Sequence, residues 1–334
     1  MRSPGFWWKA RRGTRASLLA PLGFVYGRVT ALRMRQQGQS LACPILCVGN
    51  WTAGGAGKTP VALALSALLR AYDWQPVFLS RGYGGALKGP LLINDRTDPS
   101  QCGDEPVLLA REAPTFIAKD RLAGALSACQ HGNLIIMDDG LQNPSLHKTI
   151  RLAVVDARVG IGNGLCVPAG PLRAPLRDQW PHTDAVILVG EGEPGEALAA
   201  QAPCPVFRGR TVPDPDIAAS LAGKKVMAVA GIGRPQKLYD SLESIGAEVK
   251  IGRAFEDHHT FDRHEIETLV AEGAQNGLTL VTTTKDHVRI MAVDSKLAKK
   301  FKVLPIRFVP DEAETLTQWL HQRLSAQRAS QHKL

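Results

Sequence analysis

The chain has 334 residues, of which 44% are hydrophobic, and its formal net charge is +9. This length suggests about two domains of roughly 150 residues each, and the composition is that of a globular protein, not of a disordered chain. The six cysteines form no C-x-x-C pair and no cluster with histidine, which argues against a disulfide framework and fits reduced thiols in a cytosolic compartment.

The basic excess lies entirely at the N-terminus. Residues 1–72 contain ten Lys and Arg and no Asp or Glu, so the rest of the chain is nearly neutral. The apolar run 16–26 carries Pro21 and is shorter than the roughly 20 residues that a membrane-spanning helix needs. We therefore expect residues 1–40 to form a basic amphipathic segment that lies on an anionic membrane surface. A solvated or core-capping helix, a nucleic-acid patch and a secretory signal are the alternatives. The basic side chains of the segment are Arg2, Lys9, Arg11, Arg12, Arg15, Arg28, Arg33 and Arg35.

Residues 49–60, GNWTAGGAGKTP, resemble a phosphate-binding P-loop. In that motif a glycine and four further residues precede Gly-Lys-Ser/Thr, and backbone N–H groups and the lysine surround the phosphates. Gly57, Lys58 and Thr59 supply the end of the motif, whereas Thr52 occupies the first glycine position. The residues expected to bind nucleotide are Thr52, Gly54, Gly55, Ala56, Gly57, Lys58 and Thr59.

The chain around this loop has α/β patterning. A strand is predicted at 44–49, and a helix with proline in its first turn at 60–72. Apolar runs that alternate with helical stretches follow at 76–80, 91–94, 115–118, 134–137, 152–156 and 185–189. They predict a parallel sheet that is covered on both faces and binds ligands at the carboxyl ends of its strands. We assign 41–205 to a P-loop NTPase-type domain and 206–334, where the pattern restarts, to a second, smaller α/β domain.

Two pairs of carboxylates stand where chemistry is expected. Asp138 and Asp139 follow the run 134–137, as the Mg²⁺ ligand of a Walker-B strand does, although a simple acidic turn is the alternative. Asp104 and Glu105 open a helix, where carboxylates often only cap the helix. A kinase also needs a group that orients or deprotonates the attacking hydroxyl, and Asp104 is a candidate if its helix faces the P-loop.

Two arginines lie in glycine-rich loops: Arg173 is a candidate phosphate ligand, and the glycines after Arg81 permit close backbone approach to a ligand. Arg173 lies in the long loop 158–175, and Arg81 begins RGYGG after the run 76–80. A surface arginine and a flexible turn are the respective alternatives. In the second domain, the adjacent His258 and His259 form only an incomplete metal set.

Eight motifs together resemble the tetraacyldisaccharide 4'-kinases of lipid A biosynthesis. In chain order they are VGNWTAGGAGKTP, SRGYGG, GDEP, MDDGLQN, NGLCVPAGPLRAP, AGIGRP, FEDHHTF and TTTKDHVR. The resemblance implies a peripheral enzyme on the cytoplasmic face of the bacterial inner membrane. It would move the γ-phosphoryl group of ATP to the 4'-hydroxyl of tetraacyldisaccharide 1-phosphate, an anionic lipid, to give lipid IVA.

The resemblance also implies residue roles. Asp104 would be the catalytic base, His258 would raise its readiness to accept a proton, and Lys58 would contact the β- and γ-phosphates. The implied Mg²⁺ ligands are Thr59, Glu105, Asp138 and Asp139, and the implied substrate-binding residues are Arg173, Gln142 and Arg81. Thr284 and His287 depart from the family pattern, which has glutamate and a small residue there.

The competing class is a P-loop ATPase or GTPase switch that regulates a partner by hydrolysing nucleotide. Such a switch would hydrolyse nucleotide without lipid, and TTTKD at 282–286 is only a near miss to the N-K-x-D motif of guanine recognition. A non-enzymatic membrane or nucleic-acid module leaves the constellation from Lys58 to Asp139 unexplained. We expect no nucleic-acid partner and no obligate protein partner.

Overall fold

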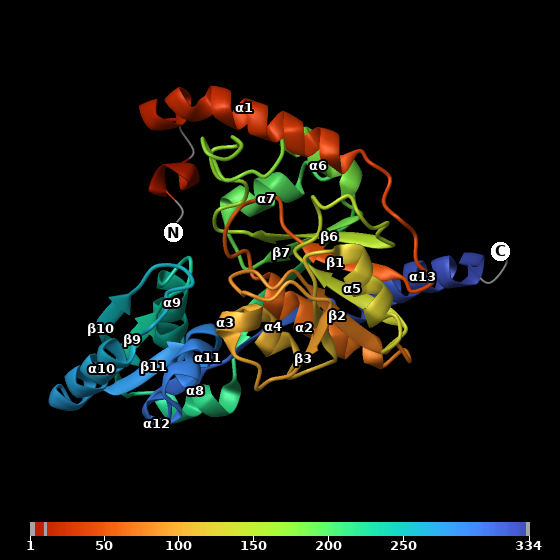
Figure 1. Cartoon of the computed structure of the whole chain (residues 1–334). Coiled ribbons are helices and arrows are strands. Elements are labelled where there is room, and N and C mark those ends of the chain that lie inside the picture. The colour runs from red at the N-terminus through yellow and green to blue at the C-terminus, as the bar shows by residue number, and fades with distance from the viewer. Residues whose placement is uncertain (1–3, 10–11, 332–334) are drawn as a thin grey trace.

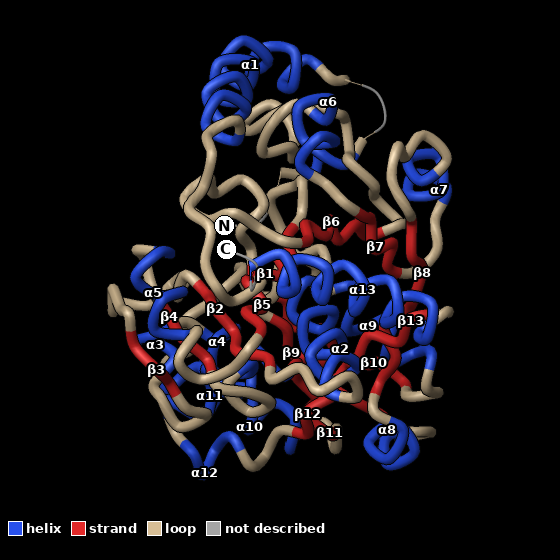
Figure 2. The backbone as a smooth tube through the Cα atoms, turned by 90° about the vertical axis from the view of Figure 1, so that its right-hand side faces the viewer, coloured by secondary structure: helices blue, strands red, loops and turns tan. Residues whose placement is uncertain are grey.

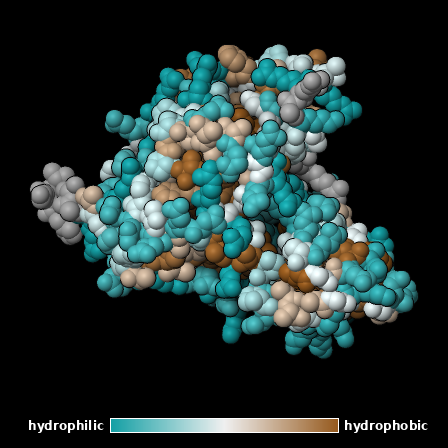
Figure 3. All heavy atoms as spheres, turned by 180° about the vertical axis from the view of Figure 1, so that it is seen from behind, coloured by the Kyte–Doolittle hydropathy of each residue, from teal (hydrophilic) through white to brown (hydrophobic). Residues whose placement is uncertain are grey.

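The structure is a computed structural model that describes residues 4–9 and 12–331. It consists of a larger unit built on a nine-stranded sheet and a smaller unit built on a four-stranded sheet (Figure 1). Arg2 and Arg11 of the expected basic segment lie outside the described residues. Seen from behind, the smaller unit projects from the larger one, and hydrophilic side chains cover most of this face (Figure 3).

The larger sheet has the strand order β13-β8-β7-β6-β1-β5-β2-β4-β3. Neighbouring strands are parallel except for the pairs β13–β8 and β3–β4 at the two edges. The predicted α/β fold with a mainly parallel sheet is therefore confirmed. The strands are β1 (Ile45–Gly49), β2 (Pro76–Ser80), β3 (Leu91–Ile93), β4 (Thr115–Ile117), β5 (Leu134–Asp138), β6 (Ile150–Asp156), β7 (Ala185–Val189), β8 (Val206–Pro213) and β13 (Ile306–Pro310).

Helices cover both faces of this sheet. Successive residues of a strand point to opposite sides, and in β1, for example, the side chains on both sides are apolar and need to be buried. Leu46 and Val48 of β1 join the core under α2 and α13, which lie side by side in Figure 2, whereas Ile45 and Cys47 join the core on the other face. The helical elements of the larger unit are η1 (Gly5–Trp8), α1 (Thr14–Met34), α2 (Lys58–Arg70), α3 (Pro99–Cys102), α4 (Asp104–Leu109), α5 (Arg121–Ala128), α6 (Leu176–Gln179), η2 (Trp180–His182), α7 (Glu193–Ala199) and α13 (Ala313–Gln331).

The smaller sheet is entirely parallel and has the strand order β10-β9-β11-β12. The stretch 278–286 divides at Thr283, whose side chain accepts a hydrogen bond from the Asp286 N–H and so caps a helix. The elements of this unit are α8 (Pro215–Leu221), β9 (Lys225–Ala230), α9 (Gln236–Ser244), β10 (Glu248–Ala254), α10 (Arg263–Gln275), β11 (Thr279–Thr283), α11 (Thr284–Val293), α12 (Ser295–Ala298) and β12 (Lys302–Leu304).

The two sheets do not divide the chain as 41–205 and 206–334. β8 pairs with β7, and β13 returns to pair with β8, so both strands belong to the larger sheet. Phe308 of β13 and Leu316 and Leu320 of α13 are buried in the core that contains α2. The C-terminal strand and helix therefore bury their apolar surface on the larger unit, and the smaller sheet is an insertion between β8 and β13.

Helix α1 lies across the larger unit (Figure 1), and most of its buried residues are small. A Cβ on Gly23 would meet the Cys166 carbonyl oxygen at 2.5 Å, and one on Gly27 would meet Cys166 Sγ at 2.6 Å, so the helix packs closely on the loop 158–175. The outward side chains are large and apolar, with Leu18 83% and Phe24 64% exposed. No helix within the described part of the chain has the length and apolar character needed to cross a membrane.

Candidate active site

The P-loop joins β1 to α2 in the middle of the larger sheet. Gly57 has a φ of 94°, a conformation that favours glycine, and α2 begins at the next residue, Lys58. The Lys58 ammonium is buried, donates to Asn50 Oδ1 at 3.4 Å and lies 3.9 Å from Asp139 Oδ2. Thr59 is buried in the first turn of α2, and Gly54 has a φ of 116°. The loop therefore directs a lysine and a helix N-terminus at one place, which is the geometry of an anion site.

The threonine at the first P-loop position has a structural reason. Thr52 forms an antiparallel bridge with Leu172 of the loop 158–175. The Ala53 N–H donates to the Pro171 carbonyl at 2.7 Å, which continues this pairing. A residue paired in this way has extended backbone, which every L-residue adopts, so glycine is not needed there.

The same pairing places Arg173 at the end of β5. Its guanidinium donates to both carboxylate oxygens of Asp139, at 2.8 and 2.9 Å. Burial opposes the charge of Asp139, but Lys58 and Arg173 outweigh it and hold its pKa below the usual range. Gln142, expected to bind substrate, donates to the Asn50 carbonyl at 2.9 Å and accepts from Arg173 at 3.5 Å. These contacts anchor Arg173 on Asp139, the carboxylate that the resemblance also gives as an Mg²⁺ ligand.

Asp138, at the end of β5, differs from Asp139 in its contacts. It is buried, and its Oδ1 has no hydrogen-bond partner within the described structure. Burial, reinforced by the nearby Glu105 carboxylate, raises the pKa of Asp138 to about 7. The Arg121 guanidinium, also buried, donates to the Asp138 carbonyl at 3.4 Å and keeps its Nη1 without a partner.

These groups fit a magnesium ion only in part. Within the described ranges no three His, Cys, Asp or Glu side chains are arranged to hold a metal. Mg²⁺, however, is commonly held by one or two carboxylates together with substrate phosphates and water. Asp138, with its unpaired oxygen, and Glu105 are two such carboxylates, and Thr59 adds a hydroxyl. Asp139 is not needed for this set.

Asp104 and His258 come together from the two units. His258 Nδ1 lies 3.3 Å from Asp104 Oδ1, and Asp104 is only 4% exposed. His258 has a φ of 58°, unusual for a residue with a Cβ and characteristic of strained functional loops. The hydrogen bond that the imidazole donates to the Asp104 carboxylate raises the pKa of His258.

The effect of His258 on Asp104 is opposite to the one expected from the resemblance. Burial opposes the charge of Asp104, but the hydrogen bond from His258 and the cations Lys285 and Arg289 outweigh it, so its pKa lies well below the usual range. His258 therefore keeps Asp104 ionised and oriented, and it does not make the carboxylate a stronger base.

Several residues at the site were missed by the sequence analysis. Lys285 forms an ion pair with Glu105, and the Tyr83 ring packs edge-on against His258 with ring centres 5.5 Å apart. Lys237 pairs with the buried Asp156 and donates to the Gly55 carbonyl of the P-loop at 3.4 Å. The only sequence signal was their place next to motifs: Tyr83 lies in SRGYGG, Lys285 in TTTKDHVR and Lys237 just after AGIGRP. Arg81, by contrast, is exposed.

A mainly parallel sheet with a P-loop and two carboxylate pairs at the carboxyl ends of its strands defines a P-loop nucleotide-dependent enzyme. The family model described as LpxK, tetraacyldisaccharide-1-P 4'-kinase, matches residues 15–325. The chain therefore belongs to the tetraacyldisaccharide-1-P 4'-kinase family, and it is a kinase.

Individual relatives agree with this assignment. The chain is 54% identical over 315 residues to the tetraacyldisaccharide 4'-kinase of Methylobacterium nodulans, with 92% of this chain and 91% of that one covered. It is 45% identical over 336 residues to the tetraacyldisaccharide 4'-kinase of Rhodopseudomonas palustris strain BisB5, with 99% of each covered. The fold is similar to that of LpxK from Aquifex aeolicus, crystallised with ATP, at a TM-score of 0.71 and 23% identity, with 92% of this chain and 99% of that one covered.

Proposed function

We propose that this protein transfers the γ-phosphoryl group of ATP to the 4'-hydroxyl of tetraacyldisaccharide 1-phosphate, the substrate that the names of its relatives imply. The observation that supports this most directly is the meeting of Asp104 and His258 at the carboxyl ends of the strands that carry the P-loop. A switch ATPase needs only to position water, whereas this pair offers an acceptor for the proton of a sugar hydroxyl.

The nucleotide would lie on the P-loop. Backbone N–H groups around Gly54 to Gly57 and the N-terminus of α2 would meet the phosphates, and Lys58 would exchange Asn50 for a phosphate oxygen. Thr59, Asp138 and Glu105 would hold Mg²⁺, which when bound neutralises phosphate charge. The pKa of about 7 at Asp138 fits a carboxylate that is stabilised by such a cation.

The acceptor hydroxyl would be oriented by Asp104. As its oxygen bonds to the γ-phosphorus, the bond to the bridging oxygen of ADP breaks, and the hydroxyl proton passes to the carboxylate. In a loose transition state the acceptor hydroxyl loses its proton late, when its bond to phosphorus is already forming. A correctly positioned, ionised carboxylate is therefore sufficient to accept that proton. Arg173, anchored on Asp139, and the more exposed Arg81 would contact phosphate oxygens at the rim of the site.

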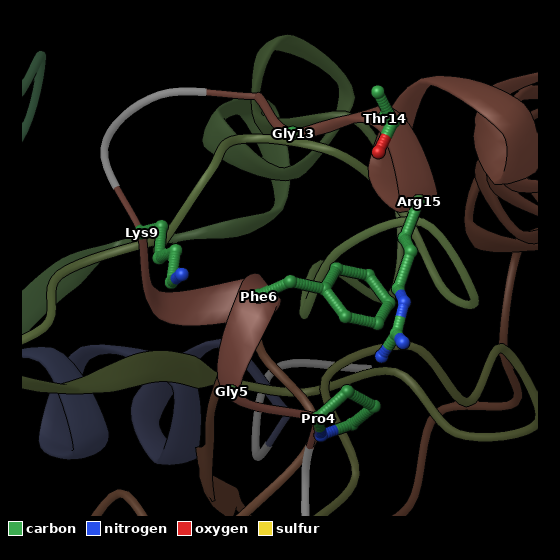
Figure 4. Close-up of a pocket in the computed structure, with 7 residues that line it drawn as sticks. All are labelled: Pro4, Gly5, Phe6, Lys9, Gly13, Thr14 and Arg15. Atoms are coloured by element: carbon green, nitrogen blue, oxygen red, sulfur yellow. The ribbon is translucent and has the colours of Figure 1, made fainter.

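The N-terminal segment would bring the enzyme to its lipid, at the cytoplasmic face of the bacterial inner membrane. The exposed face of α1 carries Leu18, Leu22, Phe24, Val25, Val29 and Leu32. A hollow of about 500 Å³ at its start is lined by Pro4, Gly5, Phe6, Lys9, Gly13, Thr14 and Arg15, with the Phe6 ring beside Arg15 (Figure 4). Apolar side chains next to cations suit the headgroup region of an anionic leaflet.

The deciding experiment follows label from γ-labelled ATP into detergent-dispersed tetraacyldisaccharide 1-phosphate. We expect the wild type to label the lipid, and we expect Lys58→Ala and Asp104→Asn to lower the labelling rate by at least about 10²-fold. The control Lys250→Ala, which changes a surface residue of the smaller sheet, should label lipid at the wild-type rate. Release of free phosphate at the same rate with and without lipid, and no lipid labelling, would instead identify the switch ATPase.

A further inference from the structure

Arg289 of α11 stands at the centre of the contact between the two units. Its side chain is only 9% exposed, and its Nη2 lies 3.0 Å from Asp104 Oδ2. Its Nη1 lies 3.2 Å from Asp286 Oδ1 and donates to the Gly231 carbonyl at 3.1 Å and to the His259 carbonyl at 3.2 Å. The Arg289 guanidinium thus joins Asp104, the candidate base, to Gly231, which directly follows β9, and to the loop that carries His258.

The surroundings of Arg289 are built to hold it still. Asp286 is completely buried, accepts the Gly231 N–H at 3.0 Å and accepts the Thr283 hydroxyl at 2.6 Å. A Cβ on Gly231 would come within 2.9 Å of Asp286 Oδ1 and 3.3 Å of Arg289 Nη1. The first glycine of AGIGRP therefore leaves room for the close approach of this ion pair.

These contacts leave some N–H groups of the Arg289 guanidinium without a hydrogen-bond acceptor in the described structure. Its Nε and Nη2 have no hydrogen-bond partner in the described structure, although Nη2 is at ion-pair distance from Asp104. Buried donors without an acceptor are unfavourable, so a residue selected for stability alone would pair them. The charge of Arg289 is therefore directed at Asp104 without a linear hydrogen bond that would fully occupy the carboxylate oxygen.

We propose that Arg289 is a positioning residue of the phosphoryl-transfer reaction: it fixes the orientation of Asp104 and holds the His258 loop against it. The inference rests on the proposed function, in which Asp104 receives the proton. Lys285, four residues earlier and so on the same face of α11, pairs with Glu105, so one helix turn places a cation on each carboxylate of GDEP. A lysine at 289 would keep the charge but not the planar fork that reaches Asp104 and two carbonyls together.

The first test compares steady-state lipid labelling by Arg289→Met and Arg289→Lys with the wild type. The matched control is Arg253→Met, which removes an exposed arginine that pairs with Glu272 in the same unit. We expect kcat to fall about 10²-fold in Arg289→Met and about tenfold in Arg289→Lys, with KM for ATP within about twofold. Arg289→Lys keeps the charge in the interior, so it decides the question if Arg289→Met does not fold; a wild-type kcat in Arg289→Lys would overturn the proposal.

The split between kcat and KM gives a readout that a merely structural arginine would not move in this way. Arg289 contacts Asp104 at 3.0 Å and does not contact the P-loop in the described structure, so its loss should lower kcat and leave KM for ATP unchanged. Equal changes in kcat and in KM for ATP would overturn the proposal.

A double-mutant cycle separates this inference from the proposed function. If Arg289 acts through Asp104, Arg289→Met in an Asp104→Asn background should cause no further loss of kcat. A second loss of similar size would show that Arg289 acts elsewhere and would overturn the proposal while leaving the kinase assignment intact. Failure of the wild type itself to label lipid would instead contradict the proposed function.

Discussion

His258 Nδ1 lies 3.3 Å from Asp104 Oδ1, and this contact joins the loop after β10 in the smaller unit to the start of α4 in the larger one. The pKa values of the two residues shift in opposite directions: the pKa of Asp104 is lowered and that of His258 is raised. Each shift favours the charged form of its group, so the contact stabilises the folded protein only where both groups are charged.

The first prediction concerns the pH dependence of this stabilisation. The Asp104 contribution is present above its unfolded pKa of about 3.9 and is lost as pH falls through the lowered folded pKa. The His258 contribution is fully present below its unfolded pKa of about 6.5 and is lost as pH rises through the raised folded pKa. We expect His258→Gln to lower Tm most between about pH 4 and 6.5, and progressively less above that window.

Thermal unfolding of both proteins from pH 4 to 9 measures this difference. His147→Gln, which changes an exposed histidine, is the control and should leave Tm unchanged at every pH. A His258→Gln effect that is constant with pH would mean that the histidine contributes by packing instead of by charge.

The second prediction concerns Asp138 and magnesium. Because burial and Glu105 raise the pKa of Asp138 to about 7, the carboxylate is protonated below that pH and is unfavourably charged above it. A cation that binds there relieves the charged state, so Mg²⁺ should raise Tm more at pH 8 than at pH 6.

Differential scanning fluorimetry with and without Mg²⁺, in the absence of nucleotide, gives the measurement. Asp138→Asn should remove the pH dependence of the Mg²⁺ shift, whereas Asp240→Asn, a change near the surface, should retain it. Equal Mg²⁺ shifts at both pH values in the wild type would exclude Asp138 as a ligand.

The third prediction concerns the ion cluster that joins α9 to the P-loop. Arg234 and Lys237 both pair with the buried Asp156, and these cations hold its pKa below the usual range although burial opposes its charge. Asp156→Asn should release Lys237 from its position beside the Gly55 carbonyl and raise KM for ATP by about threefold to tenfold, with a smaller change in kcat.

Initial rates at varied ATP concentration test this. The matched control is Glu196→Gln, which breaks an exposed pair with Arg208 on the larger unit and should leave KM unchanged. A fall in kcat at constant KM would place the cluster in the chemical step instead of in nucleotide binding.

The fourth prediction concerns membrane binding by α1. Phe24→Glu and Leu18→Glu place charge on the outward apolar face, so they should lower binding to anionic liposomes by about tenfold or more without lowering Tm. Leu126→Glu, at an exposed leucine of α5, is the control.

Co-sedimentation with anionic liposomes and, separately, with zwitterionic liposomes measures this binding. We expect binding to the anionic liposomes to be stronger and to weaken with salt, because Lys9 and Arg15 line the hollow beside the start of α1. Full binding by both glutamate variants would exclude this face as the membrane contact.

Local features of the site were accessible from the sequence. The P-loop from Gly54 to Thr59 is a contiguous motif, and strands β2 and β7 were predicted with the bounds that the structure has, because each is a continuous apolar run beside turn residues. β8 escaped assignment to the larger sheet because its sequence, VFRGRTVP, is not a continuous apolar run and does not indicate which strand it will pair with.

The sequence by itself determined the class of chemistry, since it places phosphate-binding and carboxylate groups at the ends of predicted strands. Only the tertiary structure decided which charges meet: Asp139 with Arg173, Glu105 with Lys285, and Asp104 with both His258 and Arg289. The physical reason is that a motif fixes local backbone geometry, whereas the partner of a buried charge depends on strand order and on how the two units pack. Those contacts in turn set each pKa, and so they distinguish four carboxylates that look alike in the sequence.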